Sequence, residues 1–269
     1  MTSPETSSAQ SANIPTFSLR GGAKIPLLGL GTWELSGDEG YDAVRDALDI
    51  GYRHIDTATN YKNESVLGRA LKHSGVERED LFLTSKLPGN TTERVREVLE
   101  QSLTSLETDY LDLWLLHWPP LEKEDAQRVW DEMISAQTEG LVKSIGVSNH
   151  DEEQLDALIN ATAVTPALNQ IPWSPSQHDP QKLVEHTQRG IVVSGYSPFK
   201  GANLDATALQ EVAQRHDVSP QQVIVRWHID RGVVVIPKSS NPTRLAANMS
   251  AVSLTLSDDD LALIDGLAQ

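Results

Sequence analysis

The sequence predicts an α/β protein, a (β/α)8 barrel preceded by an N-terminal β-hairpin. Eight short apolar runs alternate along the chain with amphipathic stretches, a rhythm typical of βαβ units that form a parallel sheet. The chain has 269 residues, and about 250 residues is the usual size of such a barrel. The competing fold is an open doubly wound sheet, which calls for a glycine fingerprint after its first strand. The nearest match, GLGTWE, has Glu34 at the third glycine position, so the barrel is favoured.

The strands follow from the apolar runs. The stretch FSLRGGAKIPLL, which begins at Phe17, predicts a hairpin that turns at Gly21 and Gly22. The eight barrel strands are then expected in LLGLG (27–31), RHIDT (53–57), LFLTSK (81–86), LDLWLLH (111–117), KSIGVSN (143–149), PALNQ (166–170), IVVSGYS (191–197) and VVVIPKS (233–239).

Three of the intervening stretches carry clear helix signals. In ERVREVLEQSLTSLE, five apolar residues recur at helical spacing and form one stripe: Val95, Val98, Leu99, Leu103 and Leu106. Another helix is expected to begin with Ser219 as N-cap and Pro220 at the first helical position. Near the C-terminus, Ser257 and Asp260 have the spacing of a capping box.

Composition limits the kind of partner and compartment. Residues 1–14 lack the basic and apolar regions of a secretory signal and are expected to form a disordered tail, with a single barrel domain over residues 15–269. No apolar run approaches the roughly 20 residues that span a membrane. The net charge of -16 disfavours nucleic acid and anionic lipid as partners. The chain has no cysteine, which fits a reducing compartment, and we expect a cytoplasmic monomer.

Polar side chains follow all eight runs. Because chemistry in such barrels lies on the loops after the strands, these residues are expected to meet at one rim. Taken alone, each has an ordinary structural explanation, such as a solvated lysine or a hydrogen-bonded core histidine. The rim residues, in chain order, are Thr32 and Trp33, Asp56 and Tyr61, Lys86, His117 and Trp118, Ser148 and Asn149, Asn169 and Gln170, Tyr196 and Ser197, and Lys238, Ser239 and Ser240.

Four of these residues suggest acid catalysis. A tyrosine titrates near 10, and a neighbouring cation lowers that pKa. Lys86 can supply the cation and Asp56 can hold Lys86 in place, which leaves Tyr61 as a general acid. His117 can donate a hydrogen bond to the oxygen that Tyr61 protonates and so orient a carbonyl group. This chemistry requires neither a nucleophile nor a metal.

Reduction of a carbonyl also requires a hydride, which no side chain supplies, so a nicotinamide cofactor is implied. Ser148, Asn149 and Gln170 suit its carboxamide, and Tyr196 offers a ring that can stack on the nicotinamide. Lys238 and Arg244 supply cations that the acidic surface otherwise lacks. The remaining polar rim residues, Thr32, Ser197, Ser239 and Ser240, are also expected to bind the cofactor.

These residues and their surroundings resemble the aldo-keto reductases, and most closely the bacterial branch of 2,5-diketo-gluconate reductases. The resemblance runs from about Thr16 to the C-terminus. It rests on GLGTW, GYRHIDTATNYKNE, TSK, DLWLLHWP, SIGVSN, NQIPWSP, GYSP and IPKSSNPTRLAAN, which occur in the order of the family.

The resemblance implies NADPH-dependent reduction of aldehydes, ketones or α-dicarbonyls in a TIM barrel whose bottom is closed by the hairpin at residues 17–27. It implies a catalytic tetrad and a carboxamide and stacking set that coincide with the residues given above. The resemblance also implies that Lys238, Ser239 and Arg244 bind the 2′-phosphate of the cofactor and that Asn248 contacts its adenine. It implies a substrate pocket lined by Trp33 and Trp118.

Two alternatives remain. A metal-dependent hydrolase barrel would use His54 and Asp56, which face the same side of a regular strand, but it needs further ligands at other strand ends. A nucleotide-binding barrel with poor turnover, acting as a regulatory subunit, would retain the same cofactor residues. Turnover on a panel of aldehydes distinguishes that alternative from an enzyme.

Overall fold

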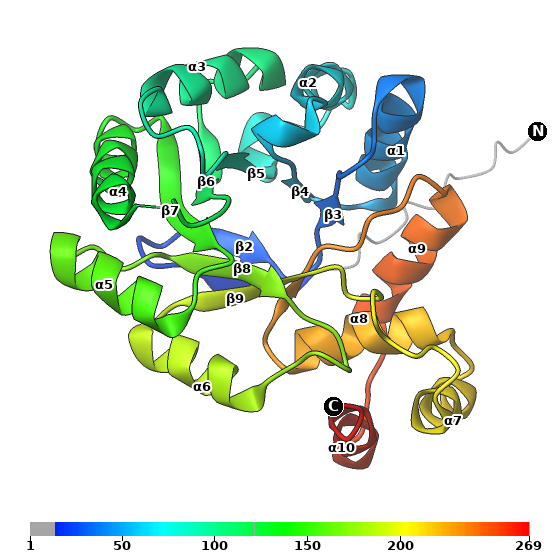
Figure 1. Ribbon diagram of the computed structural model, residues 1–269. Coiled ribbons are helices and arrows are strands. Elements are labelled where there is room, and N and C mark those ends of the chain that lie inside the picture. The colour runs from blue at the N-terminus through cyan, green and yellow to red at the C-terminus, as the bar shows by residue number, and fades with distance from the viewer. Residues whose placement is uncertain (1–13, 121, 269) are drawn as a thin grey trace, which may run out of the picture.

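The computed structural model describes residues 14–120 and 122–268, and its centre is an eight-stranded parallel sheet ringed by helices (Figure 1). The strands pair in chain order from β3 to β10. They are β3 (Leu30–Gly31), β4 (His54–Asp56), β5 (Phe82–Leu87), β6 (Leu111–Leu116), β7 (Val142–Ser148), β8 (Leu168–Pro172), β9 (Val192–Tyr196) and β10 (Val234–Val235). Each lies within or overlaps one of the eight predicted runs.

Backbone hydrogen bonds join the first and last strands and close the barrel. Leu28 pairs in parallel with Val235. The Val235 N–H donates to the Leu27 carbonyl over 2.8 Å, and the Gly29 N–H donates to the Val235 carbonyl over 2.9 Å. The predicted (β/α)8 barrel is therefore confirmed.

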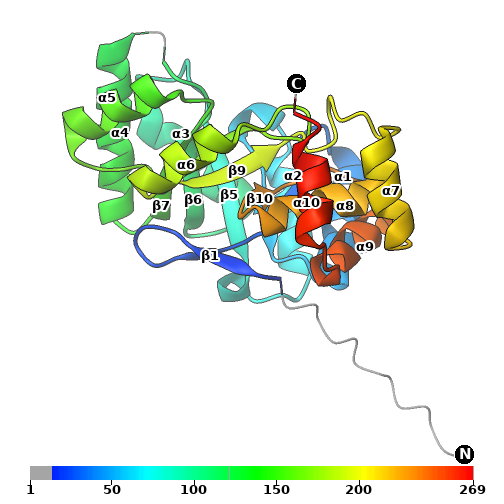
Figure 2. The same cartoon turned by 90° about the horizontal axis from the view of Figure 1, so that it is seen from below.

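The N-terminal hairpin is also confirmed. Strands β1 (Thr16–Ser18) and β2 (Lys24–Pro26) pair antiparallel. The turn between them uses Gly21 and Gly22 at φ of 98° and 92°, a conformation that glycine adopts without steric cost. An Arg20 guanidinium N–H donates to the carbonyl of Arg189, which precedes β9. The hairpin thus lies at the amino ends of the strands, beneath the barrel in Figure 2.

The helices and short 3-10 turns fill the connections between strands. They are α1 (Gly37–Ile50), η1 (Thr59–Tyr61), α2 (Glu64–His73), η2 (Arg78–Asp80), α3 (Val95–Leu106), α4 (Lys123–Thr138), α5 (Glu152–Thr162), α6 (Pro180–Arg189), α7 (Thr207–Arg215), α8 (Pro220–Asp230), α9 (Pro242–Ser250), η3 (Ala251–Ser253) and α10 (Asp258–Asp265).

The predicted helix signals act as expected. The five apolar residues of the predicted stripe on α3 are buried. Ser219 caps α8 in a capping box with Gln222, and Pro220 is the first helical residue. Ser257 and Asp260 form the predicted capping box of α10. These caps fix where α8 and α10 begin.

The predicted tail at residues 1–14 falls almost entirely outside the described residues, and the single domain over residues 15–269 stays a prediction. Across residues 14–120 and 122–268, we find no helix with the length and apolar character needed to cross a membrane.

Candidate active site

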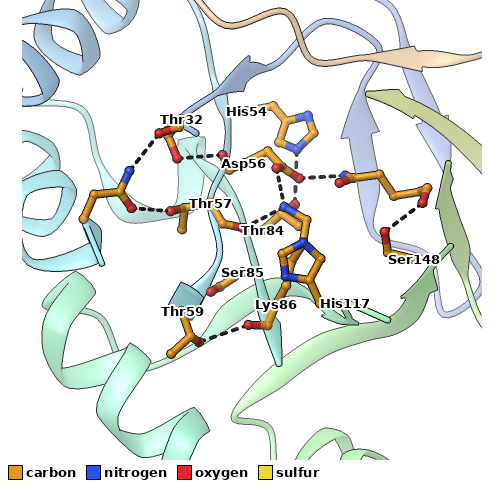
Figure 3. Close-up of polar contacts among 12 residues, drawn as sticks. Thr32, His54, Asp56, Thr57, Thr59, Thr84, Ser85, Lys86, His117 and Ser148 are labelled. Atoms are coloured by element: carbon orange, nitrogen blue, oxygen red, sulfur yellow. Dashed lines mark hydrogen bonds and ion pairs between the residues drawn. The ribbon is translucent and has the colours of Figure 1, made fainter. Parts of the chain in front are cut away.

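A buried ion pair lies at the carboxyl ends of β4 and β5. Asp56 is the last residue of β4 and Lys86 lies near the end of the neighbouring β5, so both side chains reach the same rim (Figure 3). Lys86 Nζ lies 2.5 Å from Asp56 Oδ1 and donates to the Thr57 carbonyl over 2.7 Å. Burial lowers the pKa of Lys86, but its interactions with Asp56 and Tyr61 outweigh burial, so the pKa is raised above 10.5. Lys86 therefore stays charged.

Tyr61 ends the η1 turn and stands beside this pair. Its ring centroid lies 5.3 Å from Lys86 Nζ. Burial raises the pKa of the phenol above 10.0, while Lys86 lowers it and Asp56 raises it. The prediction that Lys86 lowers the pKa of Tyr61 is correct in sign. The prediction that the pKa of Tyr61 is lowered overall is wrong, because burial has the larger effect.

His117 follows β6 and faces the tyrosine. The two ring centroids lie 5.8 Å apart in an edge-to-face arrangement. Burial and the neighbouring Lys86 charge lower the pKa of His117 to about 4, so the imidazole is neutral at neutral pH. A neutral imidazole carries one N–H and can donate one hydrogen bond. The structure thus brings all four predicted catalytic residues together.

The residues predicted to bind the carboxamide adjoin this cluster on β7 and β8. The Ser148 hydroxyl donates to the Gln170 carbonyl over 2.8 Å, and Gln170 Nε2 donates to Asp56 Oδ2 over 2.8 Å. The Asn149 amide donates to the His117 carbonyl over 3.0 Å and accepts from the Tyr196 hydroxyl over 2.9 Å. Tyr196 is half-buried, and its hydrogen bond to Asn149 keeps the ring beside the amides.

A second group of predicted cofactor residues follows β10 and leads into α9. Lys238 and Arg244 are exposed, and no acidic side chain in the described part of the chain forms an ion pair with either. Arg244 Nε lies 3.4 Å from the Ser239 hydroxyl oxygen. Asn248 is 5% exposed and faces the interior side of α9. Its predicted contact with an adenine stays a prediction.

The remaining predicted residues lie on the same rim. The Thr32 hydroxyl donates to the Asp56 carbonyl over 2.9 Å, and Ser197 and Ser240 are half-buried. Trp33 and Trp118 are 60% and 52% exposed, unlike the buried core tryptophans. Trp118, Asn149 and Tyr196 line a groove of about 430 Å³. Both exposed indoles are therefore available to a ligand.

Comparison with known proteins decides the family. A protein-family sequence model described as "Aldo/keto reductase family" matches residues 27–269. The chain belongs to the aldo/keto reductase family. The family resemblance inferred from the motifs is thereby confirmed, together with the enzyme class, an oxidoreductase.

Relatives of this aldo/keto reductase match over nearly their whole length. Methylglyoxal reductase DkgA of Salmonella typhimurium is 42% identical over 96% of this chain and 95% of the relative. The 2,5-diketo-D-gluconic acid reductase B of Corynebacterium sp. is 42% identical over 95% and 94% of the two chains.

Solved structures agree with the fold of this aldo/keto reductase. A Brucella melitensis aldo/keto reductase superimposes with a TM-score of 0.92 at 42% identity, over 95% of this chain and 100% of that chain. A Bombyx mori aldo-keto reductase in complex with NADP gives a TM-score of 0.88 at 33% identity, over 95% and 93% of the chains.

Sequence reasoning missed two buried residues of this aldo/keto reductase, Asn63 and Glu64. Asn63 Nδ2 donates to the carbonyls of Thr32 and Leu35, which fastens the Tyr61 loop to the loop that carries Trp33. Glu64 accepts hydrogen bonds from two buried serine hydroxyls. No signal in the sequence identifies them, because polar residues at a helix start are normally exposed and the burial of Asn63 and Glu64 follows from packing.

The metal-hydrolase alternative has no visible ligand set. His54 is buried and its Nε2 lies 3.1 Å from the Thr84 hydroxyl oxygen. In the parts of the chain described by the structure, no three histidine, aspartate or glutamate side chains lie close enough together to hold a metal ion.

Proposed function

We propose that this protein reduces carbonyl groups of small aldehydes, ketones and α-dicarbonyls to alcohols with NADPH, with Tyr61 as the general acid. The observation that carries this proposal is the buried Asp56–Lys86 pair beside Tyr61 and His117 at one barrel rim. The two relatives named as methylglyoxal reductase and diketo-gluconic acid reductase support carbonyl compounds as the substrate class.

The protonation states suit reduction at neutral pH. Tyr61 keeps its proton because its pKa is raised, so the phenol is ready to donate it. As the phenol gives up this proton, the charged Lys86 stabilises the phenolate that forms. The neutral imidazole of His117 donates its N–H to the carbonyl oxygen and orients it towards the phenol. Asp56 keeps Lys86 in place.

The residues present fit a nicotinamide dinucleotide phosphate. NADPH supplies the hydride when bound. Ser148, Asn149 and Gln170 would hold its carboxamide, and the Tyr196 ring would cover the nicotinamide. Lys238 and Arg244, two cations without an acidic partner in the described residues, would hold the 2′-phosphate. The solved Bombyx mori complex with NADP supports this choice of cofactor.

A monomeric state and a cytoplasmic location belong to the same proposal. The acidic net charge of -16 and the absence of cysteine support them. No nucleic acid or membrane partner is required by the proposed reaction.

The experiment follows NADPH oxidation by absorbance with a panel of aldehydes and α-dicarbonyls. We expect the wild-type protein to turn over several of them and Tyr61→Phe to lower kcat by at least about 10²-fold, the loss typical of a missing general acid. Quenching of tryptophan fluorescence by NADPH should be equal in both proteins. Saturable binding without turnover of any substrate would instead favour the regulatory barrel, and near-wild-type turnover by Tyr61→Phe would remove the role of this residue.

A further inference from the structure

A second buried carboxylate lies next to the proposed catalytic residues but has no part in the reaction. Glu64 is the first residue of α2, three positions after Tyr61, and is 6% exposed. No lysine, arginine or histidine among the described residues forms an ion pair with it. Burial raises the pKa of Glu64, while hydrogen bonds from Ser85 and Ser102 and, more weakly, the charge of Lys86 lower it. Burying a carboxylate without a cation partner is costly, so such a group calls for an explanation.

Two serine hydroxyls from different elements converge on this carboxylate. The Ser85 hydroxyl donates to Glu64 Oε1 over 2.6 Å, and the Ser102 hydroxyl donates to Oε2 over 3.1 Å. Both serines are fully excluded from solvent. Ser85 immediately precedes Lys86 on β5, and Ser102 lies on α3. Glu64 therefore links the start of α2 to the strand that carries the proposed catalytic lysine.

Thr59 adds a second hydrogen bond to the segment that carries Lys86. Its hydroxyl donates to the Lys86 carbonyl over 3.0 Å and lies 3.3 Å from the Ser102 hydroxyl oxygen. Thr59 begins the η1 turn that ends in Tyr61. Hydrogen bonds thus hold the Lys86 segment at two points, because Thr59 donates to the Lys86 carbonyl and Ser85, the preceding residue, donates to Glu64.

The packing of α2 against α3 allows this arrangement. Gly68 lies one helical turn after Glu64, on the same face of α2. A Cβ at Gly68 would lie 2.4 Å from the Ser105 carbonyl oxygen of α3. The missing side chain lets the two helices approach closely enough for Ser102 to reach Glu64.

We propose that Glu64 is a positioning residue, which sets the separation between the Tyr61 phenol and the Lys86 ammonium through its hydrogen bonds with Ser85 and Ser102. The proposal rests on the proposed function, in which those two groups cooperate. Only two residues separate Tyr61 from Glu64, so a displaced Glu64 moves the phenol directly. A misplacement of about 1 Å in a reacting group can cost roughly 10²-fold in rate.

The test compares Glu64→Ala with Glu64→Gln. Removing the carboxylate should lower kcat about ten- to a hundredfold, in line with a misplaced reacting group, and leave the Kd of NADPH unchanged. Glutamine should recover most of kcat, because its carbonyl oxygen can accept from Ser85 and its amide can donate to Ser102. The Ser102 hydroxyl can then turn to donate to Thr59, since either hydroxyl of that pair can be the donor.

The control is Asp112→Asn, which alters another buried carboxylate that touches the same strand. Asp112 is 4% exposed and accepts from the Leu83 N–H of β5. This variant should lose stability through its ion pairs with Arg78 and Lys143 and keep wild-type kcat when assayed well below its Tm. Equal loss of kcat in Asp112→Asn and Glu64→Ala would overturn the proposal, as would wild-type kcat in Glu64→Ala.

If Glu64→Ala does not fold, Ser102→Ala tests the positioning role of Glu64 instead. It removes one of the hydrogen bonds to Glu64, and its kcat should fall with unchanged NADPH affinity; unchanged kcat would overturn the proposal. Failure of the proposed function is recognised separately. In that case the wild-type protein shows no turnover or Tyr61→Phe is as active as wild type, whatever the Glu64 variants do.

Discussion

Lys86 and Asp56 form an ion pair of 2.5 Å in which the two side chains are 0% and 2% exposed. Their remaining polar atoms also have partners. Lys86 Nζ donates to the Thr57 carbonyl, and Asp56 Oδ2 accepts from Gln170. Removing two charges from water is costly unless each is paired and hydrogen-bonded, and here both are. The pair is therefore sensitive to loss of either member alone.

We expect Lys86→Met to lower the free energy of unfolding by roughly 3–5 kcal/mol, because it leaves the Asp56 carboxylate buried without its cation. The double variant Asp56→Asn with Lys86→Met should be more stable than Lys86→Met, since no uncompensated charge remains. Urea denaturation of the single and double variants measures both effects. A double variant whose loss equals the sum of the two single losses would show that the pair is not coupled.

Stability should fall in acid between about pH 6.5 and pH 4. Burial lowers the pKa values of His54, His117, His150 and His228 to about 4, below their ordinary value of 6.5. In that window the unfolded chain takes up protons that the folded chain does not, so the free energy of unfolding decreases as the pH falls. Above the window these histidines are neutral in both states and contribute no pH dependence.

Urea midpoints at about pH 7.5, 5.5 and 4.5 test this linkage. The midpoint should drop at each step below about pH 6.5, without a change in the slope of the transition. A constant midpoint down to about pH 4.5 would mean that the folded protein accepts these protons and that burial does not hold the histidines neutral.

The fold and the placement of the site were predictable because both depend on local patterns. Eight apolar runs gave eight strands, and polar residues at the ends of parallel strands share one rim in any such barrel. Asp56, Lys86 and His117 follow this rule directly. Their convergence required no knowledge of side-chain contacts.

Two properties of the site could not be predicted from the sequence, because both depend on burial. The net pKa shift of Tyr61 is set by how deeply the ring is enclosed, which neither Lys86 nor Asp56 reveals. The role of Glu64 depends on Ser102, 38 positions away on another helix, and on the close approach of the two helices. Contacts of this kind arise from packing and leave no periodic signal in the chain.

We expect Trp118 to bind substrate rather than to support the fold. Its side chain is 52% exposed and stacks against His117 with the ring centroids 6.5 Å apart. Trp118→Ala should raise KM for aromatic and long-chain aldehydes, because an apolar contact is lost, and should change KM for the smallest dicarbonyls little. Steady-state kinetics on both classes gives the comparison, and thermal unfolding serves as the control. Loss of Tm with unchanged KM would identify a structural tryptophan instead.

The cations at the start of α9 should decide between NADPH and NADH. The 2′-phosphate carries close to two negative charges, and the protein has a net charge of -16, so only local cations can offset the repulsion. Lys238 and Arg244 are exposed, and neither forms an ion pair with an acidic group in the described residues. The helix start adds backbone N–H groups that suit an anion, although Asn241 already accepts from the Arg244 N–H.

Arg244→Ala should therefore weaken NADPH binding by roughly 1.5–3 kcal/mol, the range for a charge-assisted hydrogen bond, and leave NADH, which lacks the phosphate, little changed. Arg189→Ala is the matched control, since Arg189 ends α6 beside the N-terminal hairpin, away from the rim, and pairs with Asp156. Arg189→Ala should change neither the affinity for NADPH nor the affinity for NADH. Fluorescence titration at rising salt adds a second measure, because an ionic contact is screened and the preference for NADPH should shrink. Equal losses for both cofactors would place Arg244 at the pyrophosphate or in the support of the fold, and the assignment of NADPH would then rest on the family alone.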